Sequence, residues 1–122
     1  MALIRTLAAT MAAALALAGG AAAAHARLVS SNPPDGARLS APPAQALLTF
    51  SEPLTLAFSG LSLEGPGTAR RVLGDLRLQT PRTLAAALPK DLGDGAYVLA
   101  WKAVSTDSHR TEGRVRFVLR RP

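Results

Sequence analysis

The chain has 122 residues, with 14 Lys+Arg against 8 Asp+Glu and no cysteine, so its formal net charge is +6 at pH 7. This length suits a single domain, and the lack of cysteine excludes a disulfide scaffold. One Trp, one Tyr and three Phe are too few aromatic side chains for a surface that stacks nucleic-acid bases.

The first part of the chain is organised as a secretory signal peptide. Arg5 is its only charged residue, Leu7–Gly20 is an uncharged run rich in Ala and Leu, and Ala21–Ala24 supplies small residues for cleavage. The uncharged run is too short to span a bilayer comfortably, and no other stretch approaches ~20 apolar residues. We therefore expect residues 1–24 to be removed on export, which leaves a mature domain of residues 25–122.

Export changes what the charge and composition indicate. Once Arg5 has left, the net charge is +5, which would favour nucleic acid as the partner of a cytosolic protein but not of an exported one. Met1 and Met11 leave as well, so the mature chain has no sulfur ligand for a metal. Cleavage after Ala26 is an alternative, because Ala24-His25-Ala26 also has small residues at both flanking positions.

Strand patterns recur about every ten residues in the mature chain, and no helical periodicity lasts beyond a turn or two. The expected strands are Arg27–Ser31, Gln45–Ser51, Leu56–Leu63, Arg70–Leu73, Leu76–Gln79, Thr83–Leu88 and two longer ones around Tyr97–Trp101 and Val115–Leu119. One helical turn is an alternative for Thr83–Leu88, because the run Ala85-Ala86-Ala87 has low β propensity. Seven or eight short strands predict an all-β domain, a small antiparallel β-sandwich or barrel.

The alternation of side chains predicts which face of each strand is buried. The inward positions are expected to be Ala46, Leu48 and Phe50 in one strand, Leu61 and Leu63 in the next, Tyr97, Leu99 and Trp101 in a third, and Val115, Phe117 and Leu119 in the last. Arg114, Arg116 and Arg120 occupy the opposite face of that last strand and are expected to be exposed. We interpret Tyr97 and Trp101 as core residues rather than as ligands.

The two histidines occupy positions that favour metal binding. Cleavage after Ala24 would make His25 the first residue, and a free N-terminal histidine chelates through its α-amine and its imidazole together. In an extended segment, Asp107 and His109 point to the same side. Nitrogen and oxygen donors without sulfur suit Cu(II) or Ni(II), although zinc also accepts them. The alternatives are an Asx-turn at Asp107 beside an exposed His109, and a frayed terminus at His25.

Three stretches resemble the CopC family of periplasmic copper-resistance proteins. His25–Pro33 is similar to the mature start of that family, and Phe50–Leu54 to its internal Phe-Ser-Glu segment. Tyr97–His109 resembles its most specific motif, and it is followed by Gly113 and the closing strand Val115–Leu119, as in the family. The resemblance extends over essentially the whole mature chain, in the family's order and spacing.

The resemblance implies a periplasmic, seven-stranded, immunoglobulin-like Greek-key sandwich or barrel that is related to cupredoxins. It also implies one Cu(II) per chain, bound by the amine and ring of His25 together with Asp107 and His109. Glu52 lies where some members have a glutamate associated with the site, although a solvated carboxylate is an equal interpretation. Some members carry a Met-rich Cu(I) site, but the corresponding segment here, Leu61–Arg70, has neither Met nor His.

The leading hypothesis is a non-enzymatic, periplasmic Cu(II)-binding protein that buffers copper or delivers it to an inner-membrane transporter or another periplasmic copper protein. A second hypothesis is a copper mono-oxygenase with a histidine brace formed by His25 and His109. A third is a metal-free basic interaction module. The pairs Arg70-Arg71 and Arg120-Arg121 are interpreted as solvated surface, with docking to an acidic partner or to anionic lipid as the alternative.

Overall fold

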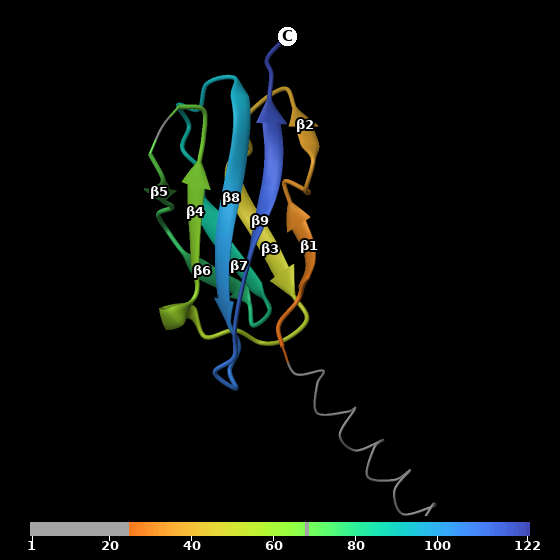
Figure 1. Ribbon diagram of the computed structural model, residues 1–122, viewed down its shortest axis with the longest axis vertical. Coiled ribbons are helices and arrows are strands. Elements are labelled where there is room, and N and C mark those ends of the chain that lie inside the picture. The colour runs from red at the N-terminus through yellow and green to blue at the C-terminus, as the bar shows by residue number, and fades with distance from the viewer. Residues whose placement is uncertain (1–24, 68) are drawn as a thin grey trace, which may run out of the picture.

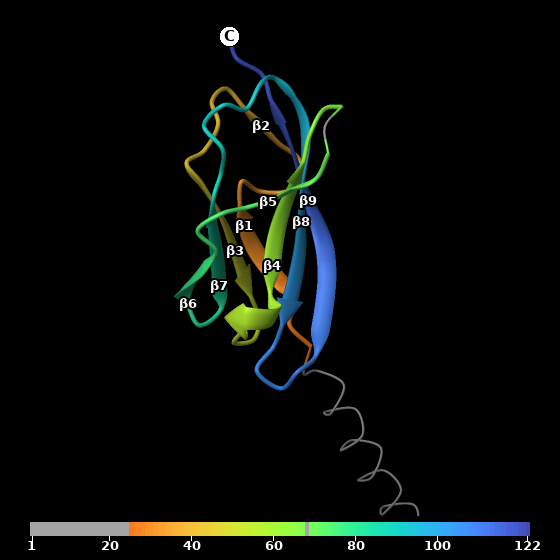
Figure 2. The same cartoon turned by 90° about the vertical axis from the view of Figure 1, so that its left-hand side faces the viewer.

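The computed structural model describes residues 25–67 and 69–122, so the expected signal peptide lies outside the described residues. This part of the chain folds into two packed β-sheets (Figures 1 and 2). The strands are β1 (Leu28–Asn32), β2 (Ala37–Leu39), β3 (Gln45–Phe50), β4 (Gly60–Glu64), β5 (Arg71–Val72), β6 (Arg77–Thr80), β7 (Thr83–Ala87), β8 (Gly95–Val104) and β9 (Arg110–Leu119). A 3-10 turn, η2 (Leu56–Phe58), precedes β4. Within the described ranges, no helix is long and apolar enough to cross a membrane.

The two sheets form an open sandwich rather than a closed barrel. One sheet has the order β1-β3-β7-β6 and the other β2-β9-β8-β4-β5. The described strands pair antiparallel, as expected for an antiparallel sandwich, and β2 adds a parallel pairing with β9 at one edge. The described residues contain nine strands rather than seven or eight, because the expectation did not include the three-residue strand β2.

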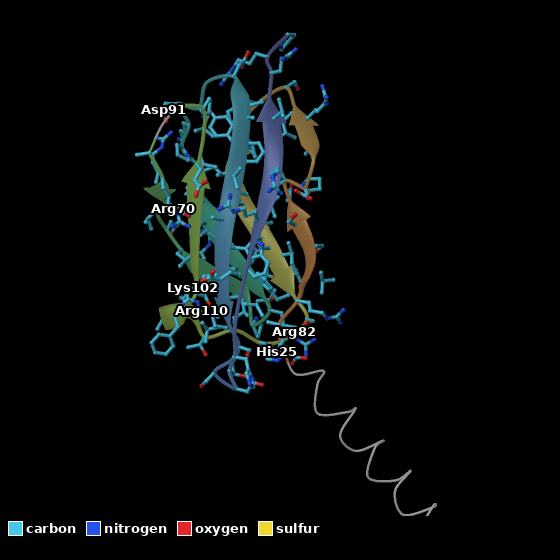
Figure 3. All side chains as sticks on the ribbon, viewed as in Figure 1. His25, Arg70, Arg82, Asp91, Lys102 and Arg110 are labelled. Atoms are coloured by element: carbon cyan, nitrogen blue, oxygen red, sulfur yellow. The ribbon has the colours of Figure 1, made fainter. Side chains whose placement is uncertain are left out.

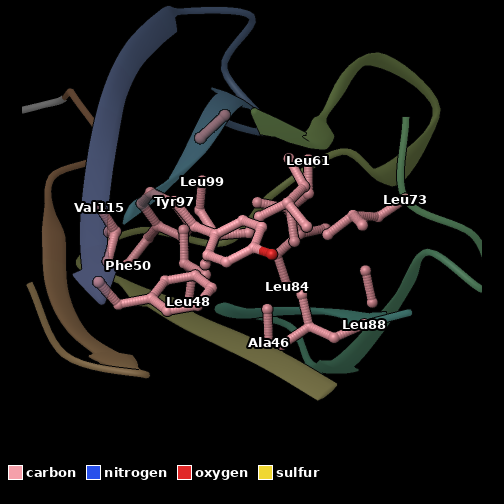
Figure 4. Close-up of a cluster of buried hydrophobic side chains, with 14 of the residues drawn as sticks. Ala46, Leu48, Phe50, Leu61, Leu73, Leu84, Leu88, Tyr97, Leu99 and Val115 are labelled. Carbon is pink, nitrogen blue, oxygen red and sulfur yellow. The ribbon is translucent and has the colours of Figure 1, made fainter. Parts of the chain in front are cut away.

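Alternating side chains bury the predicted faces (Figure 4). Ala46, Leu48 and Phe50 of β3 are at most 1% exposed, and the inward residues of β4, β8 and β9 pack against them. Tyr97 stacks on Phe117 with ring centroids 5.3 Å apart, and its hydroxyl donates to the carbonyl of Gly93 over 2.7 Å. This core provides the hydrophobic stabilisation on which a domain without disulfides depends.

The structure decides between the two alternatives for one expected element and corrects another. Thr83–Leu88 is a strand and not a helical turn, because β7 pairs along its whole length with β3 and tertiary pairing overrides the propensity of the alanines. Leu56–Leu63 is not one strand. Its first half closes into η2, where the N–H of Ser59 donates to the carbonyl of Leu56 over 3.1 Å. Leu56 and Phe58 consequently remain 36% and 64% exposed.

The long β8–β9 hairpin positions the end of the molecule that carries both histidines. Its register pairs Gly95 with Leu119 at one end and Val104 with Arg110 at the other, where the connecting loop begins. Ala26 is buried, and its carbonyl accepts a hydrogen bond of 2.9 Å from Oγ1 of Thr111. The start of the described chain is thereby held against the hairpin loop, as the position of His25 in Figure 3 shows.

Candidate metal centre

A tight loop joins β8 to β9 and carries two of the expected ligands. The N–H of Ser105 donates to the carbonyl of His109 over 2.9 Å, and the N–H of Ser108 donates to the carbonyl of Ser105 over 2.9 Å. Ser108 closes this turn with a φ of 71°, in the left-handed region. The N–H of Thr106 also donates to the carbonyl of Pro53 over 3.1 Å, which ties the loop to the segment before η2.

Asp107 and His109 lie side by side, as the spacing predicted, but for a different reason. The segment is a turn and not an extended strand. Oδ2 of Asp107 lies 3.0 Å from Nδ1 of His109, and Oδ1 lies 3.4 Å from the N–H of the same residue. The side chains remain about half exposed, 45% for Asp107 and 51% for His109. Solvent, and therefore an incoming metal or a competing ligand, reaches both groups.

Ser105 is a residue of this site that the sequence interpretation missed. Its side chain is buried, and its hydroxyl donates to Oδ1 of Asp107 and lies 3.2 Å from the carbonyl oxygen of His109. The hydrogen bond from Ser105, followed by that from His109, lowers the pKa of Asp107 to about 2. The carboxylate is therefore ionised at any physiological pH, which is the form that binds a metal. The sequence feature that could have indicated this hydrogen bond is a serine two positions before the aspartate.

His25 reaches the same place from the other end of the chain. Its ring centroid lies 4.6 Å from that of His109, with the planes at 74°. Ser51 holds the adjacent backbone, because its Oγ accepts from the N–H of Arg27 over 2.9 Å and its N–H donates to the carbonyl of Arg27 over 2.9 Å. In the full chain the backbone nitrogen of His25 is an amide bonded to Ala24, so its amine exists only after cleavage.

The donor set fits a metal that prefers nitrogen and oxygen. Two imidazoles and one carboxylate come together, and each is solvent-accessible. Nevertheless, the described residues contain no group of three His, Cys, Asp or Glu side chains arranged to hold a metal ion. Nδ1 of His109 faces the carboxylate of Asp107 and the fourth donor, the amine, is not yet formed. Within the same ranges, Glu52 makes no side-chain hydrogen bond or ion pair with these residues.

Comparison with known proteins places the chain in a family. The CopC domain model matches residues 28–120. The chain belongs to the CopC family. It is 36% identical over 124 residues to copper resistance protein C of Pseudomonas syringae pv. tomato, covering 96% of this chain and 98% of that protein.

Two solved structures of the family share the fold. The crystal structure of CopC from Methylosinus trichosporium OB3b superposes with a TM-score of 0.69 at 26% identity, covering 78% of this chain and 93% of that one. PcoC from Escherichia coli, described as a methionine-rich copper resistance protein, superposes with a TM-score of 0.69 at 30% identity. The match covers 80% of this chain and 100% of that one. This member of the CopC family differs from that description, because its methionines are Met1 and Met11, both in the expected leader.

Proposed function

We propose that this CopC-family protein is exported to the periplasm, processed after Ala24 to a single domain of residues 25–122, and acts in copper resistance by binding one Cu(II). The observation that carries the proposal is the convergence of His25, Asp107 and His109 at one end of the sandwich. Family membership and the names of the copper-resistance relatives support copper as the metal.

Each proposed ligand has a separate role. His25 supplies its α-amine and its ring, Asp107 its carboxylate and His109 its second imidazole. These donors suit Cu(II), and the Irving–Williams order favours Cu(II) over the other divalent first-row ions. Cu(I) prefers thiolate or thioether ligands, which residues 25–122 do not contain. The proposed cargo is therefore Cu(II) alone.

The proposed mechanism is ligand exchange without covalent chemistry. Because the side chains of Asp107 and His109 are half exposed, the donors of an acceptor can replace them stepwise. The acceptor we propose is an inner-membrane copper transporter or another periplasmic copper protein. A buffer role uses the same site without the final transfer. The negative charge of Asp107 stabilises Cu(II) over Cu(I), which disfavours the redox cycling of a mono-oxygenase.

Native mass spectrometry of the protein recovered from the periplasm of copper-fed cells tests the proposal directly. We expect a mass that begins at His25 and carries one copper, and loss of that copper in His109→Ala. A mass that begins at Arg27, or a metal-free mass that begins at His25 despite excess copper, would overturn the proposal. The metal-free basic module would then be the better interpretation.

A further inference from the structure

The turn η2 carries an exposed apolar tip next to the proposed metal site. Leu56, Phe58, Val29 and Val72 are the large hydrophobic side chains that are exposed in the described ranges, and two of the four lie in η2. Phe58 is 64% exposed, although most aromatic side chains of the domain lie in the core. Together, Leu56 and Phe58 form a small exposed apolar patch on this turn, and contiguous apolar patches are where proteins contact partners or membranes.

The tip adjoins a basic groove on the outer face of the five-stranded sheet. This groove, about 790 Å3 in volume, begins at Ser59, the residue after η2, and is lined by Arg70, Lys102, Arg110 and Arg114 among others. Small residues also line it beside the long ones, since Gly60 is paired with Lys102 and Ala100 with Arg114 in the sheet register. Long cationic side chains therefore border a shallow surface that small residues leave open.

The charge of the groove is predominantly positive. Glu112 is the one acidic residue that lines it, and it is paired with Arg110 through Oε1. Within residues 25–67 and 69–122, Lys102 and Arg114 make no ion pair. These two cations are available to an external anion, and they line the groove together with Ser59, the residue that follows η2.

Backbone hydrogen bonds connect this surface to the hairpin loop. The N–H of Thr55 donates to the carbonyl of Val104 over 2.8 Å, and the N–H of Thr106 donates to the carbonyl of Pro53 over 3.1 Å. Figure 3 shows Lys102 and Arg110 at the same end of the molecule as His25. Whatever binds the apolar tip and the groove is consequently held close to the loop of Asp107 and His109.

We propose that η2 and the basic groove form a docking surface for a bilayer that contains anionic phospholipid. Phe58 and Leu56 enter the headgroup region, and Lys102 and Arg114 contact lipid phosphates. Charge complementarity and the small, protruding apolar tip favour a bilayer over an acidic protein. A stable protein interface buries about 800 Å2 on each partner and requires a complementary pocket for the apolar tip. Lipid headgroups and acyl chains, in contrast, rearrange around an inserted side chain.

Co-sedimentation of the exported, purified protein with vesicles tests the proposal. Vesicles of phosphatidylcholine alone are compared with vesicles that also contain phosphatidylglycerol, at about 0.1 M salt so that distant charges are screened. We expect binding only when phosphatidylglycerol is present. Phe58→Ser should weaken it roughly tenfold, because the aromatic ring no longer enters the lipid. The double variant Lys102→Gln/Arg114→Gln should weaken it roughly 30-fold.

Matched control variants separate a specific surface from general attraction to a basic protein. Val29→Ser removes an apolar side chain that is 63% exposed on the other sheet, and it should change binding less than twofold. Arg38→Gln/Arg120→Gln removes the same charge as the first double variant from the far part of the sheet. Its effect should be no more than about threefold, because those charges lie beyond screening distance of the groove.

Three results would overturn the proposal: no vesicle binding, equal losses in the two double variants with no effect of Phe58→Ser, or Phe58-dependent binding to polyglutamate in place of vesicles. The last would point to an acidic protein as the partner. His109→Ala should bind vesicles like the wild type. A failure of the copper proposal is thus distinguishable from a failure of this one.

Discussion

Gly113 is the position where the fold depends most directly on the absence of a side chain. It is paired with Trp101 across β8 and β9, and the indole lies over it. A Cβ added at Gly113 would lie 2.4 Å from Cζ2 and 2.7 Å from Cε2 of Trp101. These are rigid ring atoms, and the ring also packs edge-on against Phe50, whose ring centroid is 5.1 Å away. The indole therefore has to move as a whole.

We expect Gly113→Ala to destabilise the domain. Overpacking of this kind costs typically about 1–3 kcal/mol. The reduced entropy of the unfolded chain offsets about 0.4–1 kcal/mol of that cost. The net loss of about 1–2 kcal/mol in the free energy of unfolding corresponds to a Tm lower by roughly 5–15 °C for a domain of this size.

Gly60→Ala is the matched control, because Gly60 lies in the same sheet and has no atom within 4 Å of an added Cβ. There only the entropy gain remains, and the Tm should rise by a few degrees. Thermal unfolding followed by tryptophan fluorescence measures both variants, and Trp101 is the only tryptophan. Nε1 of Trp101 is buried without a hydrogen-bond partner in the described structure, so packing alone orients the ring. If Gly113→Ala melts at or above the wild-type temperature with unchanged emission, the close contact inferred here is wrong.

Three further predictions concern the proposed metal site. Ser105→Ala removes the main cause of the low pKa of Asp107, which should rise from about 2 towards 3.8, whereas Ser108→Ala should leave it unchanged; NMR titration of the carboxyl carbon measures this. Copper affinity should fall steeply from about pH 7 to pH 5, measured by competition with a chelator, because protons compete for the amine and the imidazoles while Asp107 stays ionised. A flat profile would contradict these ligands. A mature chain with one alanine added before His25 should bind copper far more weakly than the wild type in the same assay, since the amine is then displaced from the ring; equal affinity would exclude the amine as a ligand.

The sequence predicted the strands whose side chains alternate and missed the elements that depend on distant partners. The inward faces of β3, β8 and β9 follow directly from period-2 patterns and were confirmed. β2 has only three residues and exists because it pairs in parallel with the end of β9, a contact that no local pattern encodes. The apolar run that contains η2 has the composition of a strand. Its conformation is decided by hydrogen bonds to neighbouring segments, and the local sequence does not reveal those bonds.

The candidate site was predictable in its residue types and less so in its construction. The spacing of Asp107 and His109 gave the right juxtaposition from the wrong backbone conformation, since the left-handed Ser108 and not an extended strand brings the two together. The grouping of His25 with His109 was a hypothesis from the residue types that the family resemblance strengthened, because no local pattern shows that such distant positions meet. The contribution of Ser105 depends on its burial, which a single serine in a polar loop does not reveal.

The way in which the ligands are held bears on what the site can do. Hydrogen bonds that do not use the proposed donor atoms hold each approach. The N–H of Thr106 donates to the carbonyl of Pro53, the N–H of Ser105 donates to the carbonyl of His109, and Oγ1 of Thr111 donates to the carbonyl of Ala26. A site whose supports are already in place loses little conformational entropy when a metal binds, which favours affinity. The side chains of Asp107 and His109 are nevertheless half exposed, whereas structural metal sites are closed. Backbone supports that are already in place, combined with side chains that solvent reaches, leave room for the donors of an acceptor, and this arrangement suits the carrier role proposed above.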